Sequence, residues 1–341
     1  WAEPLPEHTS QSNVGTGGAG ETGSRTASHP FLHRTTPVLR GHRFESNFTG
    51  HEAVLADHVV QGRALLPGVA YLEIARAALC RVHEMSDGAS LRNLVWMRPF
   101  IADAGIDGAG LAVTLTPRAD GWTDCSFSQA AGVAEILCEA QIRPMTLARD
   151  FISADLRAIF GRCGREVSVE DVYAGFSGSG VSYGPSFRTL TALRGGIDEA
   201  LGLLERRSGP RGEELLLDPG VLDGALQAAA GIEGADGRDW QSLSEGRLPF
   251  ALAEAQLLSP LPDRCWSWVR RVSGSDTLDV DVLDEEGRPC VRLRGLAFRP
   301  MRARRVKKQE IEDRQLIRKD AARPPSALAW LILPDRETEE T

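Results

Sequence analysis

The first half of the chain, up to about residue 144, shows mainly the alternating apolar and polar positions of β-strands. One longer apolar stretch, residues 67–80, has the spacing of a helix. Pro67 and Gly68 open this stretch, and proline suits a first helical turn because its missing N–H would have no partner there. Strands are predicted over residues 43–49, 94–101, 111–116, 123–129 and 134–143.

The second half, from about residue 151, repeats this order of elements. In each half a Pro-Gly-Val sequence, at residues 67–69 and again at 219–221, opens the most apolar helix. Antiparallel strands wrapped around one central helix, twice over, form a double hot-dog, an α+β fold, and we predict its halves at residues 29–150 and 151–303. The second half is expected to have helices at 169–176 and 219–232, and strands at 187–194, 199–206, 249–259, 265–272, 277–283 and 289–298.

The two ends of the chain have a different composition. Residues 1–28 are rich in glycine, serine, threonine and glutamate, which is typical of a flexible linker, and a second linker is predicted at 304–341. Residues 15–20 match the letters GxGxxG, but no predicted strand precedes them and no helix follows, so a dinucleotide site is not expected. Because the chain starts at Trp1 without a signal-peptide pattern, we expect a piece of a longer polypeptide.

The composition is that of a soluble globular protein, with 42% hydrophobic and 25% charged residues among 341. The net charge of −8 argues against a nucleic-acid-binding protein, and no apolar run approaches the roughly 20 residues of a membrane span. The six cysteines form no CxxC pair and no metal-ligand pattern with the histidines. We therefore expect reduced thiols, a cytoplasmic protein and no metal site.

His58 is the first candidate for chemistry. It precedes Gly62, which permits a tight turn, and the helix that starts near Pro67. A neutral imidazole can accept a proton near pH 7, and the N–H groups at the start of that helix, Gly68 among them, can bind an anion. A base beside an anion site is suited to removing a proton next to a carbonyl group. A lone histidine is more often structural, so the hypothesis requires a partner.

Asp223 is the best candidate for that partner, because all seven histidines lie within the first 83 residues. It lies in the apolar helix of the second half, and Gln227, four residues later, is on the same helical face. Apolar surroundings favour the neutral form of a carboxyl group, which can donate a proton, and Gln227 can orient it without adding a charge. A base and an acid of this kind are what an elimination reaction needs.

These residues belong to three motifs that are arranged as in one known family: His58-x-x-x-Gly62-x-x-x-x-Pro67, Tyr183-Gly184-Pro185-x-Phe187 and Asp223-x-x-x-Gln227. Together they resemble the dehydratase domain of modular polyketide synthases, from about residue 29 to about residue 300. Residues 48–78 look most like synthases that are served by a separate, trans-acting acyltransferase. In the family the second motif often begins Gly-Tyr-x-Tyr, whereas residues 180–183 here read Gly-Val-Ser-Tyr.

The resemblance implies a double hot-dog fold and removal of water from a β-hydroxyacyl thioester on an acyl carrier protein. His58 would take the α-proton, and Asp223 would protonate the departing β-hydroxyl group. The N–H of Gly68 would bind the thioester carbonyl, and Tyr183 would help to hold the hydroxyl; Pro67 and Gln227 complete the implied substrate site. No metal or organic cofactor is implied apart from the carrier's phosphopantetheine arm. The implied partners are the carrier protein, neighbouring synthase domains and a second copy in a homodimer.

Two alternatives remain at this point. Related domains shift a double bond, or close an oxygen heterocycle such as a pyran by adding a hydroxyl group to the new alkene. The presence of Asp223 argues against a pure isomerase, but cyclisation after dehydration stays open. A non-catalytic module that binds acyl chains or supports assembly is the second alternative, and the intact His58, Asp223 and Gln227 argue against it.

Overall fold

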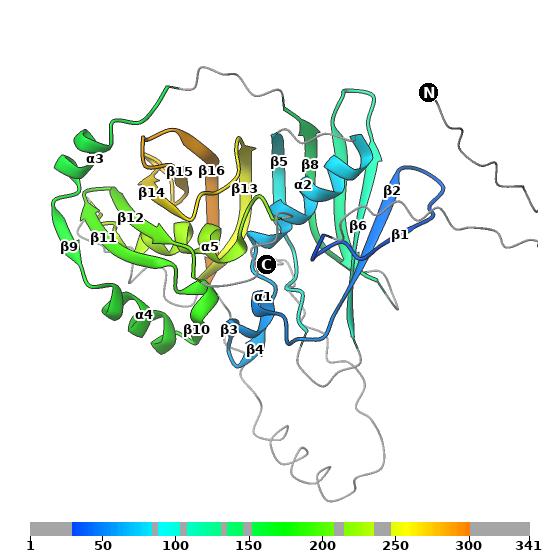
Figure 1. Ribbon diagram of the computed structural model, residues 1–341, viewed down its shortest axis with the longest axis horizontal. Helices are drawn as coiled ribbons and strands as arrows, with labels where there is room; N and C mark the ends of the chain where they lie inside the picture. The colour runs from blue at the N-terminus through cyan, green and yellow to red at the C-terminus, as the bar shows by residue number, and fades with distance from the viewer. Residues whose placement is uncertain are drawn as a thin grey trace, which may run out of the picture.

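The structure is a computed structural model that describes residues 29–83, 88–102, 108–130, 135–145, 152–207, 215–234 and 247–300. The predicted linkers at 1–28 and 304–341, and the GxGxxG letters in the first of them, lie outside the described residues. Within the described part, the two halves lie side by side and their strands form one continuous layer (Figure 1).

The N-terminal half packs one long helix, α2 (Ala70–His83), against its strands. Most of the α2 side chains are buried, as its apolar sequence predicts. A short helix, α1 (Ala53–Ala56), and two short strands, β3 (His58–Val60) and β4 (Arg63–Ala64), precede α2. The larger strands of this half are β1 (Arg34–Thr36), β2 (His42–Phe48), β5 (Ala89–Trp96), β6 (Ala109–Pro117), β7 (Thr123–Gln129) and β8 (Ile136–Pro144).

The C-terminal half has its own central helix, α5 (Pro219–Gln227), which continues as a 3₁₀ turn, η2 (Ala228–Gly231). Asp218 caps α5, since its Oδ1 accepts a hydrogen bond from the N–H of Val221 at 3.0 Å. The other helical elements are α3 (Leu156–Arg162), α4 (Val169–Gly178) and η1 (Pro185–Phe187). The strands are β9 (Arg165–Val167), β10 (Val181–Tyr183), β11 (Leu190–Gly196), β12 (Glu199–Glu205), β13 (Arg247–Leu257), β14 (Arg264–Arg271), β15 (Leu278–Leu283) and β16 (Pro289–Pro300).

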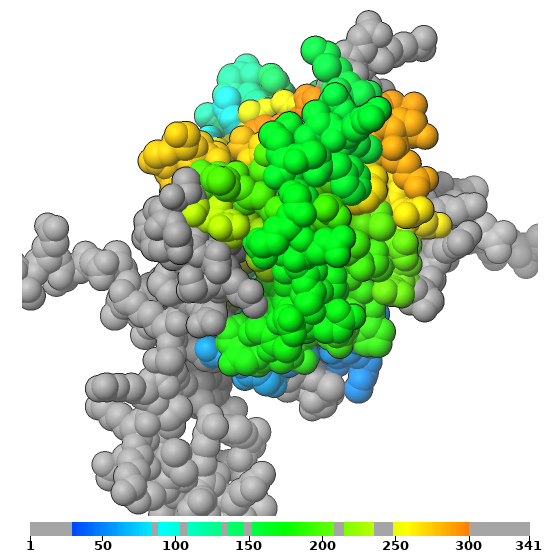
Figure 2. Space-filling view, turned by 90° about the vertical axis from the view of Figure 1, so that its left-hand side faces the viewer, coloured from blue at the N-terminus to red at the C-terminus, as the bar shows by residue number. Residues whose placement is uncertain are grey.

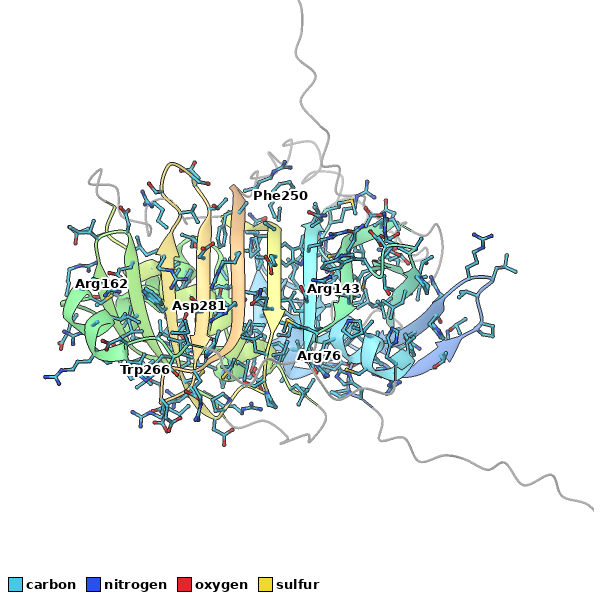
Figure 3. The ribbon with its side chains drawn as sticks, turned by 90° about the horizontal axis from the view of Figure 1, so that it is seen from above. Arg76, Arg143, Arg162, Phe250, Trp266 and Asp281 are labelled. Atoms are coloured by element: carbon cyan, nitrogen blue, oxygen red, sulfur yellow. The ribbon has the colours of Figure 1, made fainter. Side chains whose placement is uncertain are left out.

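The strand order shows that the second half repeats the first. The large sheet runs β1-β2-β6-β7-β8-β5-β13-β16-β15-β14-β12-β11-β9, and its strand pairs are antiparallel. Counted outward from the central β5–β13 pair, both halves place the first strand after the helix innermost and have strands that precede the helix, β1 and β2 or β9, β11 and β12, at the outer edge. Figure 3 shows from above that this layer crosses the whole molecule. The predicted double hot-dog fold is therefore confirmed.

The hydrophobic core is continuous across the boundary between the halves. One cluster of buried side chains includes Leu72 and Ile74 of α2 as well as Val221 and Leu222 of α5, each at most 1% exposed. Burial of such side chains contributes about 1.5–3 kcal/mol each. The two central helices therefore belong to one packed unit, which fixes the position of one relative to the other.

Four predicted elements differ from the structure by several residues at one end. The helix expected at 67–80 is α2, which begins only at Ala70, so Pro67 lies outside its first turn. The strand expected at 187–194 is β11, which begins only at Leu190, after the 3₁₀ turn η1. The strand expected at 94–101 is β5, which starts at Ala89 and ends at Trp96, because residues after Trp96 leave the sheet and pair with the segment before α2. There the N–H of Leu66 donates to the carbonyl oxygen of Phe100 at 3.0 Å, and Leu65 and Ile101 form a bridge. The helix expected at 219–232 is α-helical only to Gln227 and then tightens into η2.

Three further features concern membrane spans, the state of the cysteines and a metal site. None of the helices that the structure describes is long and apolar enough to cross a membrane. All six cysteines are in the described ranges, and none of them is in a disulfide. The described residues also contain no group of three or more histidine, cysteine, aspartate or glutamate side chains that could hold a metal ion.

A buried carboxylate, Glu73 of α2, connects the halves. Its side chain is fully buried, and Arg76 donates two hydrogen bonds to it at 2.6 and 2.9 Å, while His29 Nε2 lies 3.2 Å away. The backbone N–H groups of Leu216 and Leu217, just before α5, donate to the same two oxygens at 3.2 and 3.1 Å. Arg76 lies near the middle of the molecule, where the halves meet (Figure 3). Glu73 therefore ties the central helix of one half to the start of the other.

We expect Glu73→Gln to destabilise the fold by about 3 kcal/mol, because it leaves buried Arg76 without its counter-charge. In a domain of this size that loss lowers the unfolding temperature by roughly 6–10 °C, which differential scanning calorimetry can measure. Glu166→Gln is the matched control, since Glu166 pairs with Arg194 but its side chain is 85% exposed. Equal shifts in the two variants would contradict a structural role for the Glu73 network.

Candidate active site

His58 is held in a tight hairpin made by β3 and β4. The two residues of its turn, Gln61 and Gly62, have φ angles of 50° and 76°, the left-handed values that a two-residue hairpin turn requires. The predicted role of Gly62 in a tight turn is thus confirmed. The short helix α1 ends two residues before His58. The hairpin leaves His58 at the start of β3 and only 6% exposed.

The hydrogen bonds of His58 define which ring nitrogen can act as a base. Nδ1 lies 2.9 Å from the carbonyl oxygen of Leu65, and the N–H of Leu65 donates to the carbonyl oxygen of His58 at 3.1 Å. A carbonyl oxygen only accepts hydrogen bonds, so Nδ1 carries the proton in this contact. In the neutral ring, Nε2 is then unprotonated and can accept a proton.

The C-terminal half reaches His58 through β10. This strand pairs antiparallel with β3, and in the register Tyr183 lies opposite His58. The rings of Tyr183 and Phe187 lie 5.8 and 5.4 Å from the His58 ring, centroid to centroid. Figure 1 shows β10 beside β3 at the boundary of the halves, and Figure 2 shows the green segments around α4 directly above blue ones of the first half. The site therefore lies between the two halves.

Asp223 lies on α5, is 7% exposed, and is oriented by Gln227. The side-chain N–H of Gln227 donates to Asp223 Oδ2 at 2.9 Å, and the same nitrogen donates to the carbonyl oxygen of Phe187 at 3.2 Å. The hydroxyl of Tyr173 donates to Gln227 Oε1 at 3.0 Å. Both ends of the Gln227 amide are thus fixed, as its predicted orienting role requires.

Tyr183 lies near both candidate groups, because it stands opposite His58 in the β3–β10 pair and its phenol interacts electrostatically with Asp223. Burial raises the pKa of the Tyr183 phenol well above its usual range, and the neighbouring Asp223 adds to this shift. The phenol therefore stays protonated and remains a donor throughout the neutral range. The surroundings of Asp223 are less apolar than the helix sequence suggested, since Gln227 donates to its carboxyl group and the Tyr183 phenol lies nearby.

Pro67 and Gly68 lie just before α2, which begins at Ala70. The carbonyl oxygen of Gly68 accepts a hydrogen bond from Trp96 Nε1 at 3.1 Å, and a Cβ atom at Gly68 would lie 3.2 Å from the Trp96 ring. Trp96, at the end of β5, thus limits position 68 to a small residue. The predicted contact between the Gly68 N–H and a carbonyl group stays a prediction.

The structure also identifies residues that the sequence did not. Tyr173 of α4 supports Gln227, and the N–H of Leu190 in turn donates to the Tyr173 hydroxyl at 3.2 Å. Phe187 contacts the His58 ring and accepts from Gln227. Phe187 is part of a motif, so its backbone role could have been considered. Tyr173 stands outside every motif, and no local pattern indicates it.

Two models of one protein family match most of the chain. The family model described as polyketide synthase dehydratase domain matches residues 29–130, and the model described as polyketide synthase dehydratase N-terminal domain matches residues 153–308. Among curated proteins, the chain is 34% identical to polyketide synthase PksM of Bacillus subtilis over 84% of its length, and 35% identical to polyketide synthase ThaG of Burkholderia thailandensis over 80%. It spans only 7% and 5% of these two proteins.

Solved structures give the same result. A trans-AT PKS dehydratase domain from Brevibacillus brevis is 30% identical, with a TM-score of 0.72 over 80% of this chain and 98% of that one. The dehydratase domain from the CurF module of the curacin polyketide synthase has a TM-score of 0.73 over 80% of this chain and 99% of that one, at 19% identity. The second similarity concerns the fold alone.

The three tyrosines of the chain, two of them at the site, allow a direct test of how deeply their phenols are buried. Burial raises the pKa of Tyr173 to about 12, and that of Tyr71 and Tyr183 well above the usual value of about 10. We expect no tyrosinate absorbance at 295 nm in the folded protein at pH 10, whereas the protein unfolded in guanidinium should be about half ionised. Because the raised pKa values favour the neutral phenols in the folded state, stability should fall as the pH rises above about 10. A folded protein with one ionised tyrosine at pH 10 would contradict this description.

Proposed function

This chain belongs to the polyketide synthase dehydratase family, whose members dehydrate β-hydroxyacyl thioesters, and we propose that it performs this reaction on an acyl chain held by an acyl carrier protein. The observation that supports the proposal is the arrangement of His58 and Asp223 on different halves of the fold. Tyr183 stands opposite the first in the β3–β10 pair, and its phenol lies near the second. A substrate between the halves would thus meet a base and an acid together.

The proposed elimination uses His58 as the proton acceptor and Asp223 as the proton donor. Nε2 of His58 accepts the proton from the α-carbon, because Nδ1 is already occupied by its hydrogen bond to Leu65. The electron pair of the broken C–H bond forms the double bond, and the C–O bond to the β-hydroxyl breaks. Protonated Asp223 gives its proton to that oxygen, which leaves as water. Transfer of the proton from His58 back to Asp223 restores both groups, so the net change is loss of one water.

The other site residues hold the reacting groups. Gln227 donates to the Asp223 carboxyl group and keeps it in one orientation, and the Tyr183 phenol near Asp223 would help to hold the β-hydroxyl group. The N–H groups near the start of α2, including that of Gly68 after Pro67, would bind the thioester carbonyl and stabilise the negative charge that develops on it. Such a reaction uses proton transfer only, and the proposal includes no cofactor except the carrier's phosphopantetheine arm.

Two structures of a relative support the roles of these residue types. The dehydratase domain of the CurK module, 20% identical to this chain, is described as inactive in one variant with phenylalanine in place of histidine and in another with asparagine in place of aspartate. Because the curated relatives are multidomain synthases, we also propose that this domain works next to other synthase domains and receives its substrate from a carrier protein.

Mass spectrometry of a carrier protein loaded with a β-hydroxyacyl chain tests this function. We expect the wild-type domain to lower the mass of the acyl chain by one water. His58→Ala and Asp223→Ala should each slow this loss by about 10²–10⁴-fold while leaving the circular dichroism spectrum unchanged, because each removes one partner in proton transfer. Asp276→Ala, in the exposed turn between β14 and β15, is the matched control. A variant at position 58 or 223 with near wild-type turnover would show that its residue is wrongly assigned.

Replacement of Gln227 separates orientation from proton transfer. Gln227→Leu nearly preserves the side-chain volume but removes the hydrogen bonds to Asp223, Phe187 and Tyr173. The proton donor itself remains, so we expect a folded protein whose rate falls less than that of Asp223→Ala. Single-turnover kinetics with the same carrier-bound substrate measure the chemical step directly. A loss as large as that of Asp223→Ala would instead indicate that Gln227 contacts the substrate.

A further inference from the structure

Asp57, directly before His58, makes a set of contacts that reach into the C-terminal half. Its Oδ2 accepts hydrogen bonds from the backbone N–H of Ser186 at 2.9 Å and from the Ser186 hydroxyl at 2.7 Å. Its carbonyl oxygen accepts from the N–H of Gly184 at 2.8 Å. Three hydrogen bonds therefore hold the 184–186 segment against the residue next to His58.

Gly184 has no Cβ atom, and the Asp57 side chain occupies the space that such an atom would need. A Cβ atom there would lie 2.2 Å from Oδ1, 2.5 Å from Cγ and 2.8 Å from Cβ of Asp57. The φ angle of Gly184 is −79°, which any residue can adopt, so backbone conformation does not require glycine at this position. The approach of the Asp57 carboxylate is what excludes a side chain.

The opposite side of Ser186 contacts the helix that carries Asp223. A Cβ atom at Gly220, in the first turn of α5, would lie 2.1 Å from the carbonyl oxygen of Ser186. The next residues strengthen this contact, since the Thr189 hydroxyl donates to the Gly220 carbonyl oxygen at 3.0 Å. Ser186 is therefore the single residue that lies between the Asp57 carboxylate and the first turn of α5.

We propose that Asp57 is a positioning residue, which sets the distance between His58 and Asp223 by clamping Ser186 between β3 and α5. The inference rests on the proposed function, in which His58 and Asp223 act on the same substrate. A second set of contacts supports the same spacing. Phe187 follows Ser186 directly, and its carbonyl oxygen accepts a hydrogen bond from Gln227, which also donates to Asp223. Asp57 itself does not exchange a proton with the substrate.

The physical reason is that the acid and the base come from different halves of the fold. Proton transfer requires heavy-atom distances of about 2.6–3.2 Å, and misplacement by about 1 Å can cost roughly 100-fold in rate. The hydrophobic core fixes the halves as wholes, but a short hydrogen-bonded spacer at the site fixes the reacting groups. A side chain that acts in this way affects the chemical step more than substrate binding.

The decisive experiment is a mutant cycle at Asp57 and Gly184, measured by single-turnover dehydration of the carrier-bound substrate. Asp57→Ala should lower the rate constant about 10–100-fold, while the substrate concentration for half-maximal rate changes less than about twofold. Asp57→Asn keeps an oxygen acceptor for Ser186 and should recover much of the loss. Gly184→Ala should also be slow, because its Cβ displaces the carboxylate. All rates are taken well below the unfolding temperature, so that a loss of stability alone leaves them unchanged.

The double variant Asp57→Ala/Gly184→Ala distinguishes a clamp from two separate effects. Two of the three close contacts disappear with the carboxylate, so the double variant should be no slower than the slower single variant. Asp276→Ala serves as the control and should keep the wild-type rate. Losses that multiply, or an Asp57→Ala rate equal to wild type, would overturn the proposal while leaving the dehydratase function intact.

A wild-type domain that removes no water from any β-hydroxyacyl carrier would instead overturn the proposed function. In that case crystal structures of the wild type and Asp57→Ala still test the clamp. We expect the 184–187 segment and the first turn of α5 to move away from β3 in the variant. Unchanged positions of both would show that Asp57 does not set the spacing.

Discussion

Two short strands, β3 and β10, pair across the boundary between the halves, and the candidate site depends on this pairing. The pair places Tyr183 opposite His58, and the following residues bring Phe187 against the same ring. Strand pairing fixes the register of every residue along it, so a shift by one residue would turn Tyr183 to the other face. The clamp between Asp57 and Ser186 lies at the end of the same pair and reinforces its register.

Hydrogen bonds of buried carboxylates join the halves in addition to the apolar core that they share. Glu73 satisfies two backbone N–H groups ahead of α5, and Asp57 satisfies one backbone N–H and one hydroxyl in the loop before β11. Apolar contacts are non-directional and tolerate small displacements, whereas hydrogen bonds lose strength steeply with distance and angle. The apolar core therefore stabilises the association of the two halves, and the hydrogen bonds of Glu73 and Asp57 fix the position of one half relative to the other.

The two halves repeat one fold but contribute different chemistry. In the first, the functional group lies in a hairpin before the central helix; in the second, it lies within that helix. The duplicated order of strands provides two central helices in one packed unit, and each half adds one partner of the proposed acid–base pair. A site between two such halves is enclosed by both, which is where pockets for small molecules commonly form.

Much of this protein follows from its sequence. Periodicity and the repeated Pro-Gly-Val predicted the two helices, most of the larger strands and the double hot-dog, because burial on one face requires regular spacing of apolar residues. The motifs predicted His58, Asp223, Gln227 and Tyr183 as one site. The tertiary structure decided the tautomer of His58, the hydrogen bonds around Asp223, and the roles of Tyr173, Asp57 and Glu73. These depend on contacts between residues that lie up to 144 positions apart, and a linear pattern records spacing along the chain but not which distant backbone groups come within hydrogen-bonding distance.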